Sequence, residues 1–156
     1  MKEFIEIERS DAIKAHKNAD TKGKAMLEDL LNKKTFQKNV MERIKTIEDV
    51  FKDQGIIASE FYVKYQNLEE DTLNYEILKL ICKALNEDWE ADWKDSSQYK
   101  YYPWFIMNEG LSGFRYGGCD GWTAYTTAGS RLCFKSEELA KYAATQFVEV
   151  FRKYLY

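Results

Sequence analysis

The feature that most constrains the fold is an aromatic cluster in the middle of the chain, at residues 89–105. This stretch holds three of the four tryptophans, three tyrosines, a phenylalanine and the only proline. Each aromatic side chain buries a large area, so such a cluster usually organises the packing around it. Helical spacing dominates before the cluster, and aromatic runs separated by glycine follow it. The sequence therefore predicts an α+β fold whose two differently built halves meet at this cluster.

The half before the cluster carries the apolar spacing of helices. The clearest stripe lies at 71–86, after a predicted cap at Asp71 or Thr72, and consists of Ile77, Leu78, Ile81, Ala84 and Leu85. A thinner stripe runs from a predicted N-cap at Ser10 to about Asn32, and Gly23 predicts a kink or break within it. The helical part is therefore expected at about residues 10–86.

The sequence predicts the shorter segments of this half with different degrees of clarity. Thr46 and Asp49 form the pattern of a capping box, and Gly55 is placed to end the short helix that follows. Residues 35–45 are polar and predict a connector. Residues 56–65 are rich in aromatic residues and contain no glycine or proline that would mark a turn, so the sequence does not decide between helix and strand there.

Glycine and aromatic residues are interleaved after the cluster. Five of the eight glycines fall between residues 110 and 121, a pattern typical of antiparallel strands joined by tight turns. The predicted strands are 101–107, 113–116, 123–127 and 130–134. Pro103 is expected at an edge or a bulge because it has no N–H to donate. Ser136 caps a final helix that continues to about Tyr154, with an apolar face that should lie on the sheet.

Together these patterns predict one α+β domain at residues 1–156, a length sufficient for a single substantial core. A helical N-terminal half precedes a three- to four-stranded antiparallel β-meander, and a C-terminal helix packs on that sheet. The sheet and the last helix should occupy about residues 99–155.

Charge and hydropathy argue against several classes of protein. The net charge is −3, and residues 56–100 carry 5 basic and 10 acidic groups, whereas a nucleic-acid-binding protein normally has a basic excess. No apolar run approaches the roughly 18–20 residues that span a bilayer. Residues 1–9 are too charged for a signal peptide. The expectation is a cytoplasmic protein without membrane contact, for which nucleic acid is not the preferred partner.

The cysteines do not form a metal-binding or disulfide pattern. No Cys-x-x-Cys pair occurs among Cys82, Cys119 and Cys133. Cys82 and Cys133 lie among apolar residues and are expected to be buried thiols. His16 is the only histidine, so a structural or surface role is expected for it. No metal and no cofactor are predicted.

Two further motifs are weak. Asp88, Glu90 and Asp92 alternate like the start of a calcium loop, but Trp93 stands where that loop needs glycine. The carboxylates between residues 87 and 95 could instead supply an acid and a base, although no spacing selects a pair. Residues 110–113 match the Gly-x-x-Gly of a KH loop, but the surrounding sequence predicts strand rather than helix.

The aromatic cluster is the best candidate for a binding site, because its rings are interleaved with lysines. Tryptophan and tyrosine are enriched where proteins bind proteins, and rings beside lysines could also stack the bases of a single strand. Pure packing is the competing interpretation. The candidate binding residues are Trp93, Lys94, Tyr99, Lys100, Tyr102 and Trp104.

Three segments of the chain resemble a known family. They are Arg-Ile-Lys-Thr-Ile-Glu-Asp at 43–49, the stretch from Ala84 to Trp93 that runs on to Lys-Tyr-Tyr-Pro-Trp-Phe at 100–105, and Gly-Ser-Arg-Leu-Cys-Phe-Lys-Ser at 129–136 with the helix after it. In these segments the chain resembles a family of small uncharacterised proteins of Bacteroides-type gut bacteria, their prophages and their phages. The similarity spans the chain from about residue 18 onward. It implies a mobile-element context and an intracellular location, implies no reaction, and carries over no functional residue.

Three functional hypotheses follow from these observations. The first is a non-enzymatic accessory protein that binds a protein partner, or further copies of itself, through the aromatic cluster. The second is a single-stranded nucleic-acid binder that uses the same rings. The third is an enzyme with a carboxylate pair between residues 87 and 95. No catalytic residue is assigned.

Overall fold

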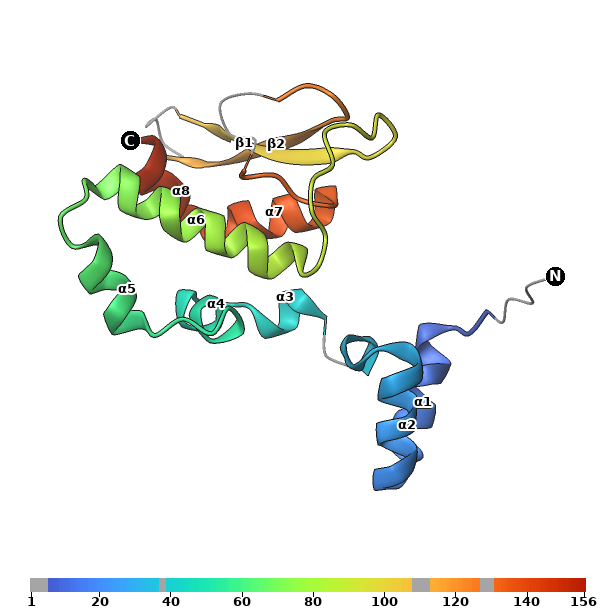
Figure 1. Ribbon diagram of the computed structural model, residues 1–156. Helices are drawn as coiled ribbons and strands as arrows, with labels where there is room; N and C mark the ends of the chain where they lie inside the picture. Colours follow the sequence, from blue (N-terminus) through green and yellow to red (C-terminus); the bar gives the residue numbers. More distant parts are fainter. Residues whose placement is uncertain (1–5, 37–38, 108–112, 127–130) are drawn as a thin grey trace. The chain divides into compact units, whose positions relative to one another are not determined.

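The computed structural model describes residues 6–36, 39–107, 113–126 and 131–156 (Figure 1). The chain divides into two compact units, Met1–Asn39 and Val40–Tyr156. The α+β class is confirmed, since helices are combined with an antiparallel sheet. The single domain at residues 1–156 stays a prediction. Among the described residues, no helix combines the length and the apolar character that crossing a bilayer would require.

The described part of the first unit contains two helices and a 3-10 turn. α1 (Arg9–Asn18) and α2 (Thr21–Leu31) precede η1 (Lys33–Phe36). The helical stripe is interrupted, but at Ala19 and Asp20 rather than at Gly23, which lies in the first turn of α2. The Asp20 carboxylate accepts a hydrogen bond of 2.8 Å from the N–H of Gly23 and caps α2. The predicted cap at Ser10 is wrong, because the helix has already begun at Arg9 and Ser10 lies inside it.

His16 joins the elements of this first unit. Its ring stacks on Phe36 with 4.2 Å between the ring centres, and its Nε2 lies 2.8 Å from a carboxylate oxygen of Glu28. These contacts tie α1 to both α2 and η1, in agreement with the structural role expected for this histidine.

The second unit begins with three short helices, α3 (Val40–Arg43), α4 (Ile47–Asp53) and α5 (Ala58–Tyr65). The capping box is confirmed. Thr46 Oγ1 accepts from the N–H of Asp49 at 3.1 Å, and Asp49 Oδ2 accepts from the N–H of Thr46 at 3.0 Å. Gly55 follows α4 with a φ of 63°, a left-handed conformation that glycine adopts without strain. The segment 56–65, left open by the sequence, is largely the helix α5.

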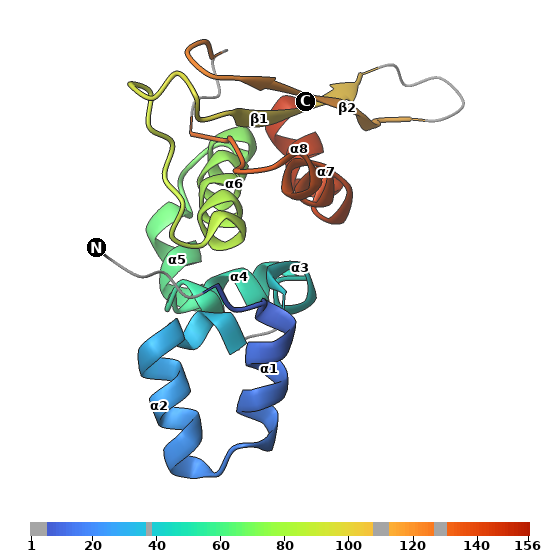
Figure 2. The same cartoon turned by 90° about the vertical axis from the view of Figure 1, so that its right-hand side faces the viewer.

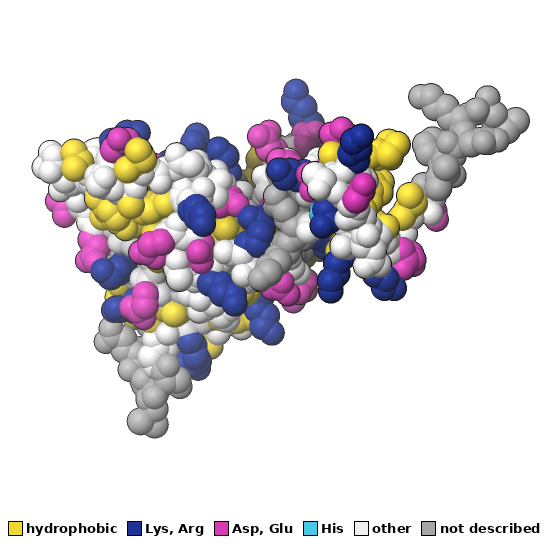
Figure 3. All heavy atoms as spheres, turned by 90° about the horizontal axis from the view of Figure 1, so that it is seen from below, with side chains coloured by type: hydrophobic (Ala, Val, Ile, Leu, Met, Phe, Trp, Pro, Cys, Tyr) yellow, Lys and Arg dark blue, Asp and Glu magenta, His cyan; other side chains and the backbone are white. Residues whose placement is uncertain are grey.

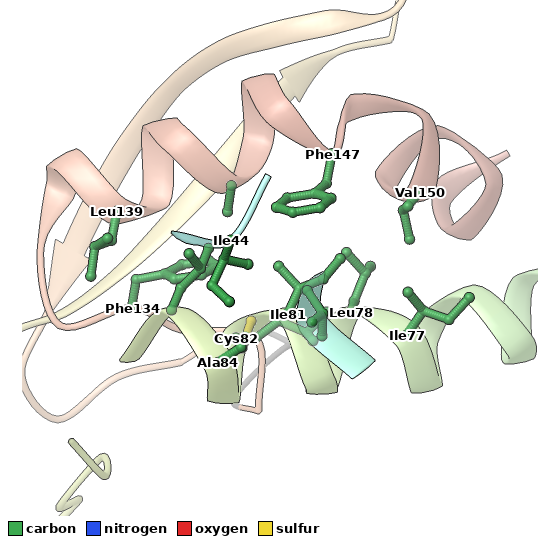
Figure 4. Close-up of a cluster of buried hydrophobic side chains, with 14 of the residues drawn as sticks. Ile44, Ile77, Leu78, Ile81, Cys82, Ala84, Phe134, Leu139, Phe147 and Val150 are labelled. Atoms are coloured by element: carbon green, nitrogen blue, oxygen red, sulfur yellow. The ribbon is translucent and has the colours of Figure 1, made fainter. Parts of the chain in front are cut away.

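Helix α6 (Glu70–Asn86) lies at the centre of the core. All five residues of its predicted stripe are buried. Figure 4 shows Ile77, Leu78 and Ile81 on the side of α6 that faces Phe147 and Val150 of the C-terminal helices. The predicted cap at Asp71 or Thr72 is wrong, because α6 starts at Glu70 after Glu69, without a side-chain cap. The helix is therefore stabilised by the packing of its buried stripe rather than by an N-terminal side-chain cap.

The C-terminal segment forms two helices, α7 (Glu137–Gln146) and α8 (Val148–Leu155), rather than the single helix predicted. The cap at Ser136 is confirmed, since its hydroxyl accepts from the N–H of Leu139 at 3.3 Å. The break falls at Phe147, a buried residue whose φ of −113° and ψ of 31° depart from helical values. α7 lies against both strands, and α8 packs along α6 (Figure 2).

The sheet of the described residues has two antiparallel strands, β1 (Lys100–Ile106) and β2 (Arg115–Trp122). The prediction of three to four strands is therefore not met. Residues 113–116 and 123–127 were predicted as separate strands, whereas one strand runs through the glycines between them, and residues 123–126 are irregular. The predicted strand at 130–134 is reduced to a bridge between Phe134 and Tyr101. Residues 127 and 130, and most of the Gly-x-x-Gly match at 110–113, lie outside the described residues.

Strand β2 continues through its glycines because aromatic rings of neighbouring residues occupy the space where a side chain at each glycine would lie. A Cβ on Gly117 or Gly118 would lie 2.4 Å or 2.3 Å from atoms of the Trp104 ring. The register shifts between Trp104 and Phe105, so the strand bulges beneath this ring. Pro103 lies just before the bulge, consistent with its predicted position.

Candidate functional site

The candidate site is the outer face of the sheet, which points away from the helices. The inner face is covered: Phe105 contacts Phe151 of α8 with 4.8 Å between ring centres, and Tyr101 and Cys119 pack against the core. Side chains alternate along a strand. Lys100, Tyr102 and Trp104 therefore lie on the opposite, outer face. Figures 1 and 2 show the helical layer on one side of the sheet alone.

Trp104 is held against the backbone of the neighbouring strand. It pairs with Gly118 across the ladder. Its six-membered ring lies where side chains of Gly117 and Gly118 would otherwise stand. The indole nevertheless remains 47% exposed. The bulge and the two glycines thus fix one side of the ring and leave the other to solvent.

Lys100 is buried and its ammonium group is enclosed by backbone carbonyl groups. Nζ donates to the carbonyl oxygens of Gln98 at 2.8 Å and Thr123 at 3.0 Å, with that of Asp95 at 3.3 Å and a further contact to the carbonyl of Asp92. A buried charge requires such partners. This side chain therefore links the loop before β1 to the residue that follows β2.

Trp93 covers the same ammonium group. Its ring centre lies 5.3 Å from Lys100 Nζ, within the range of a cation–π interaction. The ring remains 38% exposed. Trp93 therefore extends the outer face beyond the strands, and the ammonium group of Lys100 lies against one side of its ring.

The loop that carries Trp93 is shaped by its own polar side chains. Asp92 Oδ1 accepts from the N–H of Lys94 at 2.8 Å, and Asp95 Oδ1 accepts from the hydroxyl of Ser97 at 2.6 Å and its N–H at 2.8 Å. The hydrogen bonds from Ser97 lower the pKa of the Asp95 carboxyl. Lys94 is exposed at the surface of this loop.

Tyr102 lies on the outer face but its hydroxyl oxygen is buried. Burial raises the pKa of Tyr102 to about 12. The Cys133 thiol is close enough to influence this hydroxyl. Tyr102 thus lies on the outer face with its polar tip withdrawn from solvent.

Tyr99 belongs to the other side of the sheet. Its ring stacks on Tyr101 with 6.1 Å between ring centres, and a Cβ on Gly121 would contact both rings. Tyr101 faces the core, so Tyr99 lies at the margin of the inner face. Of the six predicted residues, the structure brings Trp93, Lys100, Tyr102 and Trp104 to one face and separates Tyr99 from them.

The sequence reasoning missed two aromatic residues of the outer face, Trp122 and Tyr125. Trp122 pairs with Lys100 and shares its face. Tyr125 lies edge-on to Trp122 with 6.2 Å between ring centres. These side chains are 46% and 73% exposed. The sequence feature that could have identified them is the glycine-rich run. Gly117 and Gly118 leave room for the Trp104 ring, so the strand continues through them to Trp122. We call Trp93, Trp104, Trp122 and Tyr125 the outer aromatic surface.

The thiols are not activated. Cys82 and Cys133 are buried, as predicted, and burial raises the pKa of each thiol. Cys119 is partly buried, and burial together with the nearby Glu137 raises its pKa to about 11. A thiol with a raised pKa is a poor nucleophile at neutral pH.

The carboxylates of Glu87, Asp92 and Asp95 have structural partners within the chain. Glu87 pairs with Arg43 at 3.1 Å and with Lys135 at 3.1 Å. Glu87 thereby connects α3, the end of α6 and the segment before α7. Within the described ranges, no cluster of three or more histidine, cysteine or acidic residues is placed to hold a metal ion.

Comparison with known proteins adds no relative: no family model, no curated protein and no solved structure matches the chain. The resemblance described from the sequence therefore stays a prediction.

Proposed function

We propose that this chain is a non-enzymatic binding module that docks a protein partner on the outer aromatic surface. The observation that supports it best is that Trp93, Trp104 and Trp122 keep between 38% and 47% of their surface exposed on one side of the sheet. Large rings gathered at an exposed face mark interaction sites more often than scattered apolar residues do. Tryptophan and tyrosine are also the residues that dominate binding energy in protein interfaces.

Two of the rings are supported by contacts within the protein itself. Trp104 rests on the backbone at Gly117 and Gly118, and Trp93 rests on the buried ammonium of Lys100. A ring that is already ordered loses little conformational entropy when it is covered. This preorganisation favours binding through these rings over a role as filler for a core.

The charges around the surface favour a basic partner. The loop before β1 carries exposed Asp88, Glu90, Asp92 and Asp95 against a single exposed lysine, while β2 adds one exposed charge of each sign, Arg115 and Asp120. Charge complementarity directs encounter and orientation. The proposed partner is therefore a protein segment that presents apolar side chains flanked by lysine or arginine.

The same charges weigh against nucleic acid as the ligand. Lys100, one of the two lysines interleaved with the rings, points its ammonium inward to carbonyl oxygens. Phosphate contacts need cations directed outward. On the helical side of Val40–Tyr156, Lys and Arg side chains are interspersed with Asp and Glu side chains rather than gathered (Figure 3).

The enzyme hypothesis gains no support from the carboxylates. Glu87 is engaged by two cations, and the pKa of Asp95 is lowered rather than raised. A general acid at neutral pH needs the opposite shift.

A location in the cytoplasm and a role in a phage or prophage are part of the proposal, and both rest on the resemblance described from the sequence.

The test compares Trp122→Ala with a matched exposed aromatic on the other side of the unit, Tyr62→Ala in α5, which is 43% exposed. Affinity capture from the natural host should retain at least one protein with wild type and Tyr62→Ala, and lose it with Trp122→Ala. The affinity should then be measured with the purified protein. Equal retention by both variants, or salt-sensitive binding of an oligonucleotide that Trp122→Ala abolishes, would overturn the proposal.

A further inference from the structure

One edge of strand β2 is unpaired among the described residues. In the part of the chain that the structure describes, β2 pairs with β1 on one side, and no backbone hydrogen bond reaches its other side. The far side of β1, by contrast, is bridged by Phe134. A row of unpaired N–H and C=O groups is a template for another strand.

The composition of β2 leaves this edge accessible. Soluble proteins commonly protect edge strands with lysine or proline, and β2, Arg-Tyr-Gly-Gly-Cys-Asp-Gly-Trp, contains neither. Gly117, Gly118 and Gly121 carry no side chain that would shield the backbone. A second strand could therefore approach along the whole element.

Opposite charges stand at two positions of β2 on the same face. Arg115 pairs with Ile106 and Asp120 pairs with Tyr102, and these two β1 residues share the outer face. The bulge at Gly117 makes this possible, because without the extra residue the two side chains would point to opposite faces. Both side chains are exposed. Among the described residues, no salt bridge involves either of them; Arg115 Nη1 donates to the carbonyl of Gly113 at 3.2 Å.

We propose that β2 pairs antiparallel with β2 of a second copy of this chain, about a two-fold axis between Gly117 and Gly118. Arg115 of each copy then lies opposite Asp120 of the other, which gives two cross-strand ion pairs. Tyr116 lies opposite Cys119, both on the inner face. The product is a continuous sheet of four strands, two from each copy, with the helices of both copies on the same side.

Charge complementarity selects this register and this occupant. A two-fold axis through Asp120 would place its carboxylate opposite its own copy, and like charges directly opposite destabilise a strand pair. In the proposed register every opposed pair shares a face, and each arginine meets an aspartate. Two-fold pairing also closes the assembly, as in most homo-oligomers. The pairing uses the backbone edge of β2, whereas the outer aromatic surface consists of side chains on one face of the sheet, so the inference does not rest on the proposed function.

A charge exchange tests the ion pairs, with dimer dissociation measured by sedimentation equilibrium of the full chain. Arg115→Glu and Asp120→Lys each place like charges opposite each other twice per dimer, and each should weaken dimerisation about tenfold. The double variant restores opposite charges and should recover the wild-type dissociation constant. Lys94→Glu, which changes net charge as Arg115→Glu does, should have no comparable effect. A wild-type monomer up to 100 micromolar, or a double variant weaker than both single ones, would overturn the proposal.

Cross-linking tests the register independently. Opposed residues of an antiparallel pair lie about 4.5–5.5 Å apart at Cα, within the range of a disulfide. Oxidised Tyr116→Cys should therefore give a covalent dimer through Cys119 of the second copy, and adding Cys119→Ser should abolish it. Arg115→Cys, which faces Asp120 in this register, should cross-link far less. A dimer that forms equally from both cysteine variants, or from neither, contradicts this pairing.

Discussion

The ammonium group of Lys100 lies 5.3 Å from the centre of the Trp93 ring and donates to the carbonyl of Gln98 at 2.8 Å. The same group donates to the carbonyl of Thr123 at 3.0 Å. One side chain thus holds the loop before β1, the strand itself and the exit of β2. The position of Trp93 on the outer face depends on this buried charge.

Replacing Lys100 with methionine should destabilise the protein by about 3 kcal/mol, because carbonyl groups that the ammonium satisfies would lose their donor. Lys94→Met, at an exposed position of the same loop, should change stability by less than about 0.5 kcal/mol. Urea unfolding followed by far-UV circular dichroism measures both. Similar losses in the two variants would show that Lys100 has no special structural role.

Gly118→Ala should destabilise the sheet by about 1–3 kcal/mol, because its Cβ would lie 2.3 Å from the Trp104 ring. The same substitution should be much less damaging when Trp104→Ala is already present, since the clash is then gone. A double-mutant cycle in urea should give a coupling of at least about 1 kcal/mol. Additive effects would mean that the ring does not lie on this strand.

The stability of the protein should depend on Tyr102 at high pH. Its pKa is raised from 10.0 to about 12 in the folded state. Below pH 10 both states hold the proton and this contribution is fully present. As pH rises from about 10 to about 12, the unfolded chain releases the proton first, so stability falls. Unfolding free energies between pH 9 and 11.5 should fall more steeply for wild type than for Tyr102→Phe, and parallel curves would contradict the burial of this hydroxyl.

Asn86 is expected to be essential for attaching the end of α6 to the segment before α7. Its side chain is buried, donates to the carbonyl of Cys133 at 2.8 Å and accepts from the N–H of Lys135 at 2.9 Å. Asn86→Ala should cost about 2–4 kcal/mol, because both partners would be left unsatisfied. Asn74→Ala is the matched control: that buried amide donates to the carbonyl of Glu70 in its own helix, so about 1 kcal/mol is expected. A smaller loss for Asn86→Ala than for Asn74→Ala would refute this role.

Local sequence patterns predicted the helices well where a side chain caps the backbone a few residues away or where apolar residues recur at helical spacing. The box at Thr46 and Asp49, the cap at Ser136 and the buried stripe of α6 depend on neighbours a few residues away, so they are visible in sequence. The caps at Ser10 and Asp71 were misplaced because helix starts also depend on packing that local sequence does not report. The break at Phe147 was missed because a regular apolar stripe continues across it.

The sheet was harder to predict because contacts between residues far apart in the sequence place some residue types in environments where they are usually not found. Gly117 and Gly118 resemble turn residues, yet Trp104 occupies their side-chain space and keeps them in a strand. Lys100 resembles a surface cation, yet it is fully buried among carbonyl oxygens. The outer aromatic surface was therefore predicted at Trp93 and Trp104, while Trp122 could be recognised only once the strand was known to continue to it.

The most direct measurement of the central claim places a photo-cross-linking residue, p-benzoylphenylalanine, at Tyr125 of the full chain in the cells that naturally produce it. Tyr125 is 73% exposed at the margin of the outer aromatic surface, and the same residue at Tyr62 serves as the control. Irradiation should yield a defined protein adduct from position 125 that is absent from position 62 and disappears when Trp122→Ala is added. The account is contradicted by adducts that are the same at both positions, by adducts insensitive to Trp122, or by nucleic acid as the cross-linked species.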